Sequence, residues 1–214
     1  SANKVVETNV GLMLRLGDSA VASQTGGIVL NQLHITNEEG ETVIDQEFTS
    51  IGQAFDFEIA GLNENIPHAS IVIPLNQPIP QGAVFRKFNG QQWQDFVVDD
   101  RNNIASAPFI DGQCPNANSE TYTDGLTAFD HCILITLSDG GPNDADNMIN
   151  GVIKDPGSIA IGKQQRTNNE TKPVLEKPTE PQKNASSLSS FIVGFSTLLL
   201  LSKTTMLHAM NKPS

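Results

Sequence analysis

Short apolar runs separated by turn residues make up most of the chain, and no sustained helical period interrupts them. Within residues 54–59, Phe55, Phe57 and Ile59 alternate with Asp56 and Glu58, as expected of a half-buried antiparallel strand. The continuous apolar runs 69–75 and 131–137 indicate more deeply buried strands. The pattern therefore predicts a chain dominated by β structure.

The dipeptide Asn89-Gly90 lies between two further apolar runs and predicts a β-hairpin, with Trp93 packed in or near the core. Turn residues every 8–12 positions are typical of a β-sandwich. Residues 99–130 have no clear pattern and are expected to be an irregular segment that covers one end of the sheets. We predict an all-β, antiparallel, β-sandwich-like domain over residues 1–162. Its predicted strands are 10–16, 28–36, 42–48, 54–59, 69–75, 84–88, 93–98, 131–137, 150–154 and 158–161.

The composition changes after Gly162. Residues 163–187 have almost no large apolar side chains and predict a disordered polar linker, or stalk. Residues 188–201 are strongly apolar, and a helix of that length is about 21 Å long, which is shorter than a bilayer core of roughly 30 Å. Extension to residue 210, with Lys203 reaching toward the interface, gives sufficient length. We therefore predict a C-terminal apolar helix at 188–210 that serves as a transmembrane or sorting segment.

Charge is distributed unevenly between these parts. The whole chain has a net charge of −11, while residues 1–162 contain six basic and 21 acidic residues, a net charge of −15. Such a domain repels phosphate backbones, so nucleic-acid binding is not expected. An acidic surface suits calcium or basic partners, although it also simply favours solubility.

Catalytic motifs give no indication of an enzyme. The sequence contains no GxSxG, no HExxH and no glycine-rich phosphate loop. The four histidines, at positions 34, 68, 131 and 208, have no recognisable spacing to a catalytic partner. We therefore predict a non-enzymatic protein.

Cys114 and Cys132 are the only cysteines. A metal site would need more thiolates or histidines than the neighbourhood offers, since His131 is the one histidine near them. In an oxidising compartment the two would form a disulfide, and two unrelated buried thiols are the alternative.

An acidic loop follows the apolar run that ends at Leu137. Its aspartates and asparagines are close enough to repel one another unless water, backbone amides or a cation neutralise them. The EF-hand pattern fails here because Met148 and Ile149 occupy positions that require an oxygen ligand and a glycine. A looser calcium site is one interpretation, and turn formation through side-chain hydrogen bonds to the backbone is the other. The candidate calcium ligands are Asp139, Asp144, Asp146, Asn150 and Asp155.

Several short motifs resemble those of a bacterial family, the choice-of-anchor U domain. The resemblance covers roughly residues 10–161, and its most specific block is DGGPNDAD at 139–146. That family tends to have glycine at the position of Asn147, and asparagine tolerates the same left-handed backbone. The other motifs are LRLGD at 14–18, IPL at 73–75, GAVFRKF at 82–88, NGQQWQDF at 89–96, CP at 114–115, GLT at 125–127, HC at 131–132, NG at 150–151 and DPG at 155–157.

The resemblance implies a domain near the C-terminus of an exported surface protein, followed by a sorting or anchoring tail. It implies no enzymatic activity. We therefore expect a structural module at the cell envelope, with the membrane and a sorting or anchoring machinery as partners and further domains upstream in a longer precursor. The alternative is a calcium-dependent adhesion or carbohydrate-binding module. A hydrolase would need a nucleophile or paired acids that the sequence does not reveal.

Overall fold

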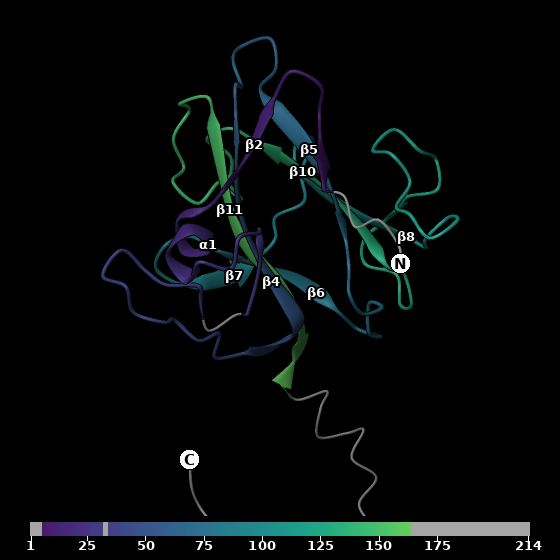
Figure 1. The fold of residues 1–214 in the computed structure, drawn as a ribbon, viewed down its shortest axis with the longest axis horizontal. Coiled ribbons are helices and arrows are strands. Elements are labelled where there is room, and N and C mark those ends of the chain that lie inside the picture. Colours follow the sequence, from purple (N-terminus) through teal and green to yellow (C-terminus); the bar gives the residue numbers. More distant parts are fainter. Residues whose placement is uncertain (1–5, 32–33, 164–214) are drawn as a thin grey trace, which may run out of the picture. The chain divides into compact units, whose positions relative to one another are not determined.

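The computed structural model describes residues 6–31 and 34–163 of the chain. Within them, two antiparallel sheets contain nearly all of the regular structure, and one short helix accompanies them (Figure 1). The all-β antiparallel fold predicted from the sequence is therefore confirmed. The predicted linker after Lys163 and the predicted helix at 188–210 lie outside the described residues. Within the described part of the chain, no helix has the length and apolar character needed to cross a bilayer.

The larger sheet carries most of the features discussed below. Its long central strand β11 (Val152–Gly162) pairs with β4 (Phe48–Ala60) on one side and with β6 (Val84–Phe88) on the other. Edge strands β2 (Met13–Leu16) and β7 (Trp93–Asp95) complete the order β2-β4-β11-β6-β7, and β3 (Val29–Leu30) also pairs with β4.

The smaller sheet packs against the larger one across a shared apolar core. Its order is β1 (Glu7–Thr8), β5 (His68–Pro74), β10 (Cys132–Ser138), β8 (Asn103–Ala107) and β9 (Thr123–Asp124). Alternate residues of its strands face alternate residues of β4 and β11, as the two-residue period of a strand requires. The main core residues are Phe55, Phe57, Ile59, Ile71, Ile73, Ile133, Ile135, Leu137, Ile153 and Ile159.

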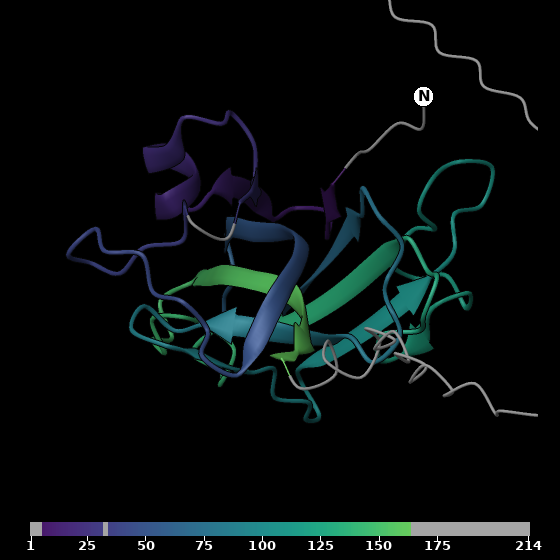
Figure 2. The same ribbon diagram turned by 90° about the horizontal axis from the view of Figure 1, so that it is seen from below.

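A second apolar cluster covers part of the outer face of the larger sheet. Helix α1 (Asp18–Ser23) and the segment leading to β4 lie on that side of the sheet (Figure 2). Their apolar residues pack against side chains of β4, β6 and β7. Trp93 is buried in this cluster against Phe88, with ring centroids 5.5 Å apart, so its predicted packing role is confirmed. The outer face of this sheet is therefore partly covered, and Phe88 and Trp93 on that face are buried.

Several predicted boundaries were wrong for identifiable reasons. Residues 42–47 are not a strand, since β4 begins at Phe48 and extends through polar residues to the predicted run. Helix α1 was missed because six residues are too few for a periodic signal. Strands β8 and β9 lie within the supposedly irregular segment 99–130, where small residues hide the pattern.

The predicted strands 150–154 and 158–161 are one continuous strand, β11, which passes through Asp155-Pro156-Gly157. Proline lacks a backbone donor and normally ends a strand. Here Pro156 pairs in register with Asp56 of β4, while β6 begins to pair only at Gly157. The proline therefore lies where β11 has a single neighbouring strand, and the strand continues.

The predicted disulfide between Cys114 and Cys132 is present, with 5.6 Å between the Cα atoms. It joins the long connection between β8 and β9 to the first residue of β10. Cys132 is completely buried, so the bond fixes this connection to the interior of the smaller sheet.

Candidate functional site

The acidic loop between β10 and β11 is held together by its own side chains. The Asp139 carboxylate accepts hydrogen bonds from the backbone N–H groups of Asn150, at 3.2 Å, and Gly151, at 2.8 Å. Asp146 accepts from the Met148 N–H at 2.9 Å and from the Asn150 side-chain amide at 3.2 Å. These bonds are the turn-forming interactions that the sequence left as one of two interpretations.

Asp144 has a similar role but is buried. Its carboxylate accepts the backbone N–H of Gly140 at 2.9 Å and that of Lys154 at 3.0 Å, and only 1% of the residue is exposed. Burial raises the pKa of Asp144 to about 6, and the two backbone hydrogen bonds oppose this increase. Asp144 therefore attaches the loop to the first part of β11.

Asp155 does not belong to the loop. It lies within β11, opposite Phe57 of β4, and its side chain points into the core between the sheets. There it forms an ion pair with the Lys87 ammonium, and both residues are almost completely buried. Asp155, the fifth candidate calcium ligand, therefore lies in the core and not in the loop with the other four.

Calcium binding by the loop stays a prediction. Within residues 6–31 and 34–163, no three His, Cys, Asp or Glu side chains are grouped so that they could hold a metal ion. The loop carboxylates already accept N–H donors, which satisfies much of the negative charge that would otherwise attract a cation. Turn formation therefore explains these aspartates without a ligand.

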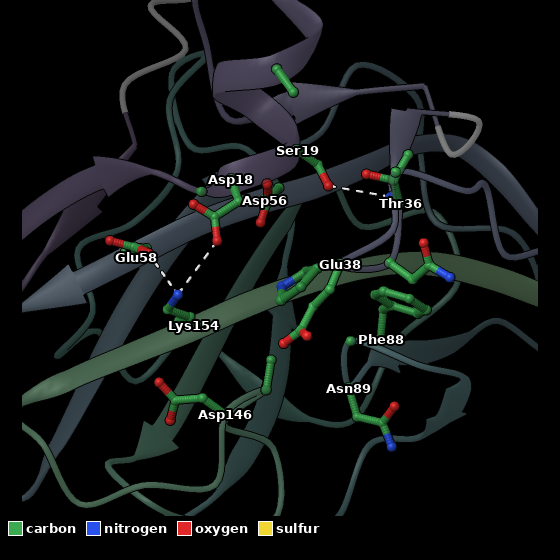
Figure 3. Close-up of a pocket in the computed structure, with 17 residues that line it drawn as sticks. Asp18, Ser19, Thr36, Glu38, Asp56, Glu58, Phe88, Asn89, Asp146 and Lys154 are labelled. Atoms are coloured by element: carbon green, nitrogen blue, oxygen red, sulfur yellow. Dashed lines mark hydrogen bonds and ion pairs between the residues drawn. The ribbon is translucent and has the colours of Figure 1, made fainter.

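A cavity of about 520 Å³ lies on the outer face of the larger sheet, beside helix α1 (Figure 3). Strands β4 and β11 form its floor, and α1, residues 36–40 and the turn after β6 contribute to its walls. Lys154 is the basic side chain of this lining. The acidic residues that line it are Asp18, Glu38, Asp56, Glu58 and Asp146.

Lys154 projects from β11 between two of these carboxylates. Its Nζ is 3.4 Å from Asp18 Oδ2 and 3.5 Å from Glu58 Oε1 (Figure 3). Partial burial acts to lower the pKa of Lys154, but the two carboxylates outweigh it and raise the pKa above its usual value. The lysine therefore stays protonated and neutralises part of the cavity's negative charge.

Asp56 lies deeper, under the start of α1. Its Oδ2 accepts the backbone N–H of Ala20 at 2.8 Å, and only 4% of the residue is exposed. A Cβ atom at Gly17 would lie 2.1 Å from Asp56 Oδ1, so only glycine allows this close approach. Burial raises the pKa of Asp56 despite the backbone hydrogen bonds. Asp56 therefore serves to fix α1 to the sheet.

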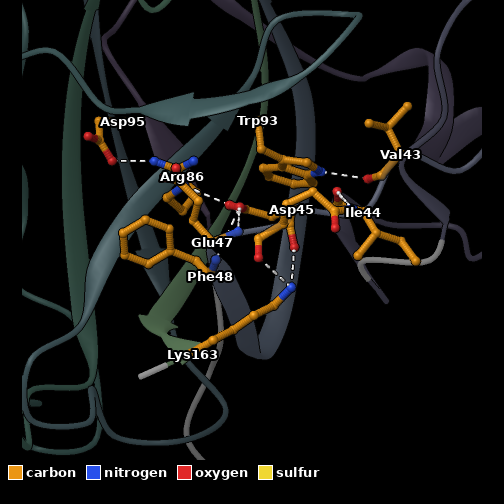
Figure 4. Close-up of polar contacts among 10 residues, drawn as sticks. Val43, Ile44, Asp45, Glu47, Phe48, Arg86, Trp93, Asp95 and Lys163 are labelled. Carbon is orange, nitrogen blue, oxygen red and sulfur yellow. Dashed lines mark hydrogen bonds and ion pairs between the residues drawn. The ribbon is translucent and has the colours of Figure 1, made fainter. Parts of the chain in front are cut away.

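A second polar network lies where the described chain ends (Figure 4). Asp45, 4% exposed, accepts the backbone N–H groups of Glu47, at 3.0 Å, and Phe48, at 3.2 Å. Its other oxygen accepts Arg86 Nε at 2.7 Å. The entry to β4 is thus bonded to β6 across the sheet.

Arg86 and Lys163 extend this network in two directions. The Arg86 guanidinium also pairs with Asp95 of β7 and lies 4.3 Å from the centre of the Phe48 ring. The Lys163 ammonium donates to the carbonyl of Asp45 at 2.9 Å and to that of Gln46 at 2.7 Å. We call Asp45, Arg86, Asp95 and Lys163 the exit network, because the chain leaves the sheet at Lys163.

Sequence reasoning found the acidic loop but missed the cavity and the exit network. Asp18, Asp56 and Lys154 are far apart in sequence, so no local spacing reveals that they meet. A signal did exist for the buried cations. Arg86 and Lys87 are adjacent in a short apolar strand, so their side chains must point to opposite faces of the sheet. Where the sheet is covered on both faces, both side chains are buried.

In comparisons with protein-family models, with curated proteins and with solved structures, the chain has no significant match.

Proposed function

We propose that this chain is a non-enzymatic structural module next to the anchor of an exported bacterial surface protein. The observation that carries the proposal is the order along the chain: a β domain to Gly162, a polar stretch at 163–187 and an apolar segment at 188–210. In this arrangement the linker separates the domain from the membrane, and the apolar segment attaches or sorts it.

The position of β11 supports this proposal. A tail attached to the membrane would pull on the strand that precedes it, and that strand is paired with β4 and with β6. Lys163 adds two side-chain hydrogen bonds and one backbone bond, to Glu47, at the point where the pull would act. An edge strand with a free exit would be easier to peel away.

The disulfide supports an exported location. Disulfides persist in oxidising compartments and are rare in the cytosol, and the Cys114–Cys132 bond closes a connection with little regular structure of its own. The motifs that resemble the choice-of-anchor U domain agree with the same placement.

Cell fractionation tests the proposal. Deletion of residues 188–214 should release the protein from the membrane fraction, because the apolar segment is lost. The matched control deletes residues 163–187, which removes a stretch of similar length but keeps the apolar segment, and this variant should stay with the membrane. If the variant without 188–214 stayed in the membrane fraction, the proposal would be wrong.

A second candidate is a calcium-dependent adhesion or carbohydrate-binding module, and the cavity beside α1 favours it. Its carboxylates, Lys154 and the side chain of Asn89 offer acceptors and donors suited to hydroxyl groups. Calorimetric titration with calcium and a glycan array, each repeated with chelator, test this candidate. Glycan binding that chelator abolishes would support it, whereas no heat with calcium and no glycan bound would exclude it.

A further inference from the structure

Lys87 and Asp155 approach each other in the core between the two sheets. Lys87 of β6 pairs in register with Gly157 of β11, and Asp155 lies two residues from Gly157 on the same face of the strand. Diagonal neighbours of this kind lie close enough for long side chains to meet. The Lys87 Nζ donates directly to Asp155 Oδ1.

Aromatic side chains keep water away from this pair. Phe55 and Phe57 are completely buried on β4, and Phe85 on β6 is 3% exposed. A Cβ atom at Gly157 would lie 2.7 Å from the Phe85 ring, so glycine lets that ring pack against β11. Lys87 and Asp155 themselves are 1% and 0% exposed. The pair is therefore isolated from solvent.

The ion pair leaves hydrogen-bonding capacity unused. Among the described residues, Asp155 Oδ2 accepts no hydrogen bond, and Asp155 is the single hydrogen-bond partner of the Lys87 ammonium. An ammonium has three donors and a carboxylate about four acceptor sites. Two charges so incompletely satisfied and so fully desolvated are costly in a protein core. An uncharged amide in the same place would carry one N–H and one C=O.

We propose that Lys87 and Asp155 join through an intramolecular amide, an isopeptide bond between Nζ and Cγ. A proton first passes from the ammonium to the carboxylate along their hydrogen bond, which leaves a neutral amine and a neutral acid. The nitrogen lone pair attacks Cγ, the Nζ–Cγ bond forms, and one Cγ–O bond breaks. The leaving oxygen, which already holds the transferred proton, takes a second proton from the nitrogen and departs as water, so the reaction needs no oxidant, reductant or further reactant.

The surroundings favour the neutral forms that this reaction needs. Burial lowers the pKa of Lys87 and raises that of Asp155, although the attraction between the two opposes both changes. These directions add to the geometry, which holds the Lys87 nitrogen directly against the Asp155 carboxylate.

The bond would connect β6 to β11, the last strand of the domain. Hydrogen bonds between these strands involve only residues 157–160 of β11, and a covalent link would reinforce this short ladder. The inference concerns a modification of the folded core and does not depend on whether the chain is attached to a membrane.

Mass spectrometry of the full-length protein tests the inference. The folded chain should weigh less than its sequence mass, corrected for the disulfide, by one water molecule. Digestion should then yield a branched peptide that joins the segment around Lys87 to the segment around Asp155. A wild-type chain that keeps its full mass after prolonged incubation in the folded state, and yields separate peptides, would overturn the inference.

Two variants provide controls. Lys87→Arg keeps the positive charge but offers no amine for amide formation, so it should keep the full mass. The double variant Lys87→Met/Asp155→Leu replaces the pair by apolar side chains and should fold without any mass loss. A mass loss in Lys87→Arg equal to that of the wild type would show that the water leaves from another site and overturn the assignment.

Discussion

Aspartates in this protein are neutralised in two contrasting ways. In the loop before β11, Asp139, Asp144 and Asp146 accept N–H groups that the loop itself supplies. In the larger sheet, Asp45 and Asp155 pair with buried cations on β6. Every turn contains backbone N–H groups, so residues close in sequence can neutralise an aspartate in the first way. The second way needs a cation from a strand that is distant in sequence, so it exists only in the completed sheet.

The contrast predicts very different costs of removing a carboxylate. Asp155→Ala leaves the Lys87 charge buried without a partner, whereas Lys87→Met/Asp155→Leu removes both charges, and neither variant can form the amide. We therefore expect Asp155→Ala to be less stable than the double variant by about 3–5 kcal/mol in the free energy of unfolding. Chemical denaturation of the two variants measures this difference. A difference below about 1 kcal/mol would mean that Lys87 reaches water and that the contrast is wrong.

Asp45→Ala should have the next largest effect. It removes the partner of Arg86 Nε and two backbone hydrogen bonds at the start of β4, at an expected cost of about 2–3 kcal/mol. Asp95 provides the matched control, because it pairs with the same arginine but its side chain is 80% exposed. Asp95→Ala should cost less than about 1 kcal/mol in the same denaturation experiment.

Asp144 combines both environments, since it is buried like Asp155 yet bonded to backbone like its loop neighbours. Its folded-state pKa of about 6 exceeds the ordinary value of 3.8, so between these pH values the folded state holds a proton that the unfolded state has lost. Stability should therefore rise as the pH falls from about 6 to 4, by about 2 kcal/mol relative to Asp144→Asn. Denaturation of both proteins across this range measures the difference, and a constant difference would contradict it.

The smallest effect is expected at Asp146. Its bonds to the Met148 N–H and the Asn150 side chain lie at the exposed tip of the loop, so Asp146→Ala should cost about 0.5–1 kcal/mol. Asp146→Asn, which keeps an acceptor for Met148, should cost less. Thermal melting of the two variants compares them. A loss as large as that of Asp155→Ala would place Asp146 in the same class as the buried aspartates.

The same contrast explains what the sequence could predict. Strands with strong local patterns, such as β5 and β10, were found because burial on both faces leaves a continuous apolar run. The turn role of the loop aspartates was foreseen as one alternative because it involves residues a few positions apart. Interactions between distant strands have no local pattern, and the pairing of Asp155 with Lys87 was therefore missed.

Asp155 shows the limit most clearly. Its neighbours Pro156 and Gly157 separate the two strands predicted at 150–154 and 158–161, and a carboxylate in such a break would be exposed. The proline was instead accommodated where β11 has one neighbour, and the glycine was needed to admit the Phe85 ring. Both residues therefore allow a central strand to pack, whereas the composition of the three-residue motif suggested a turn.

The order of strands in the larger sheet also has a consequence for biosynthesis. β11 lies between β4 and β6, yet it is the last strand of the domain to leave the ribosome. Until it arrives, the two halves of the sheet have no strand to join them, and their inner edges stay unpaired. The domain therefore completes its fold only after nearly all of it has been synthesised.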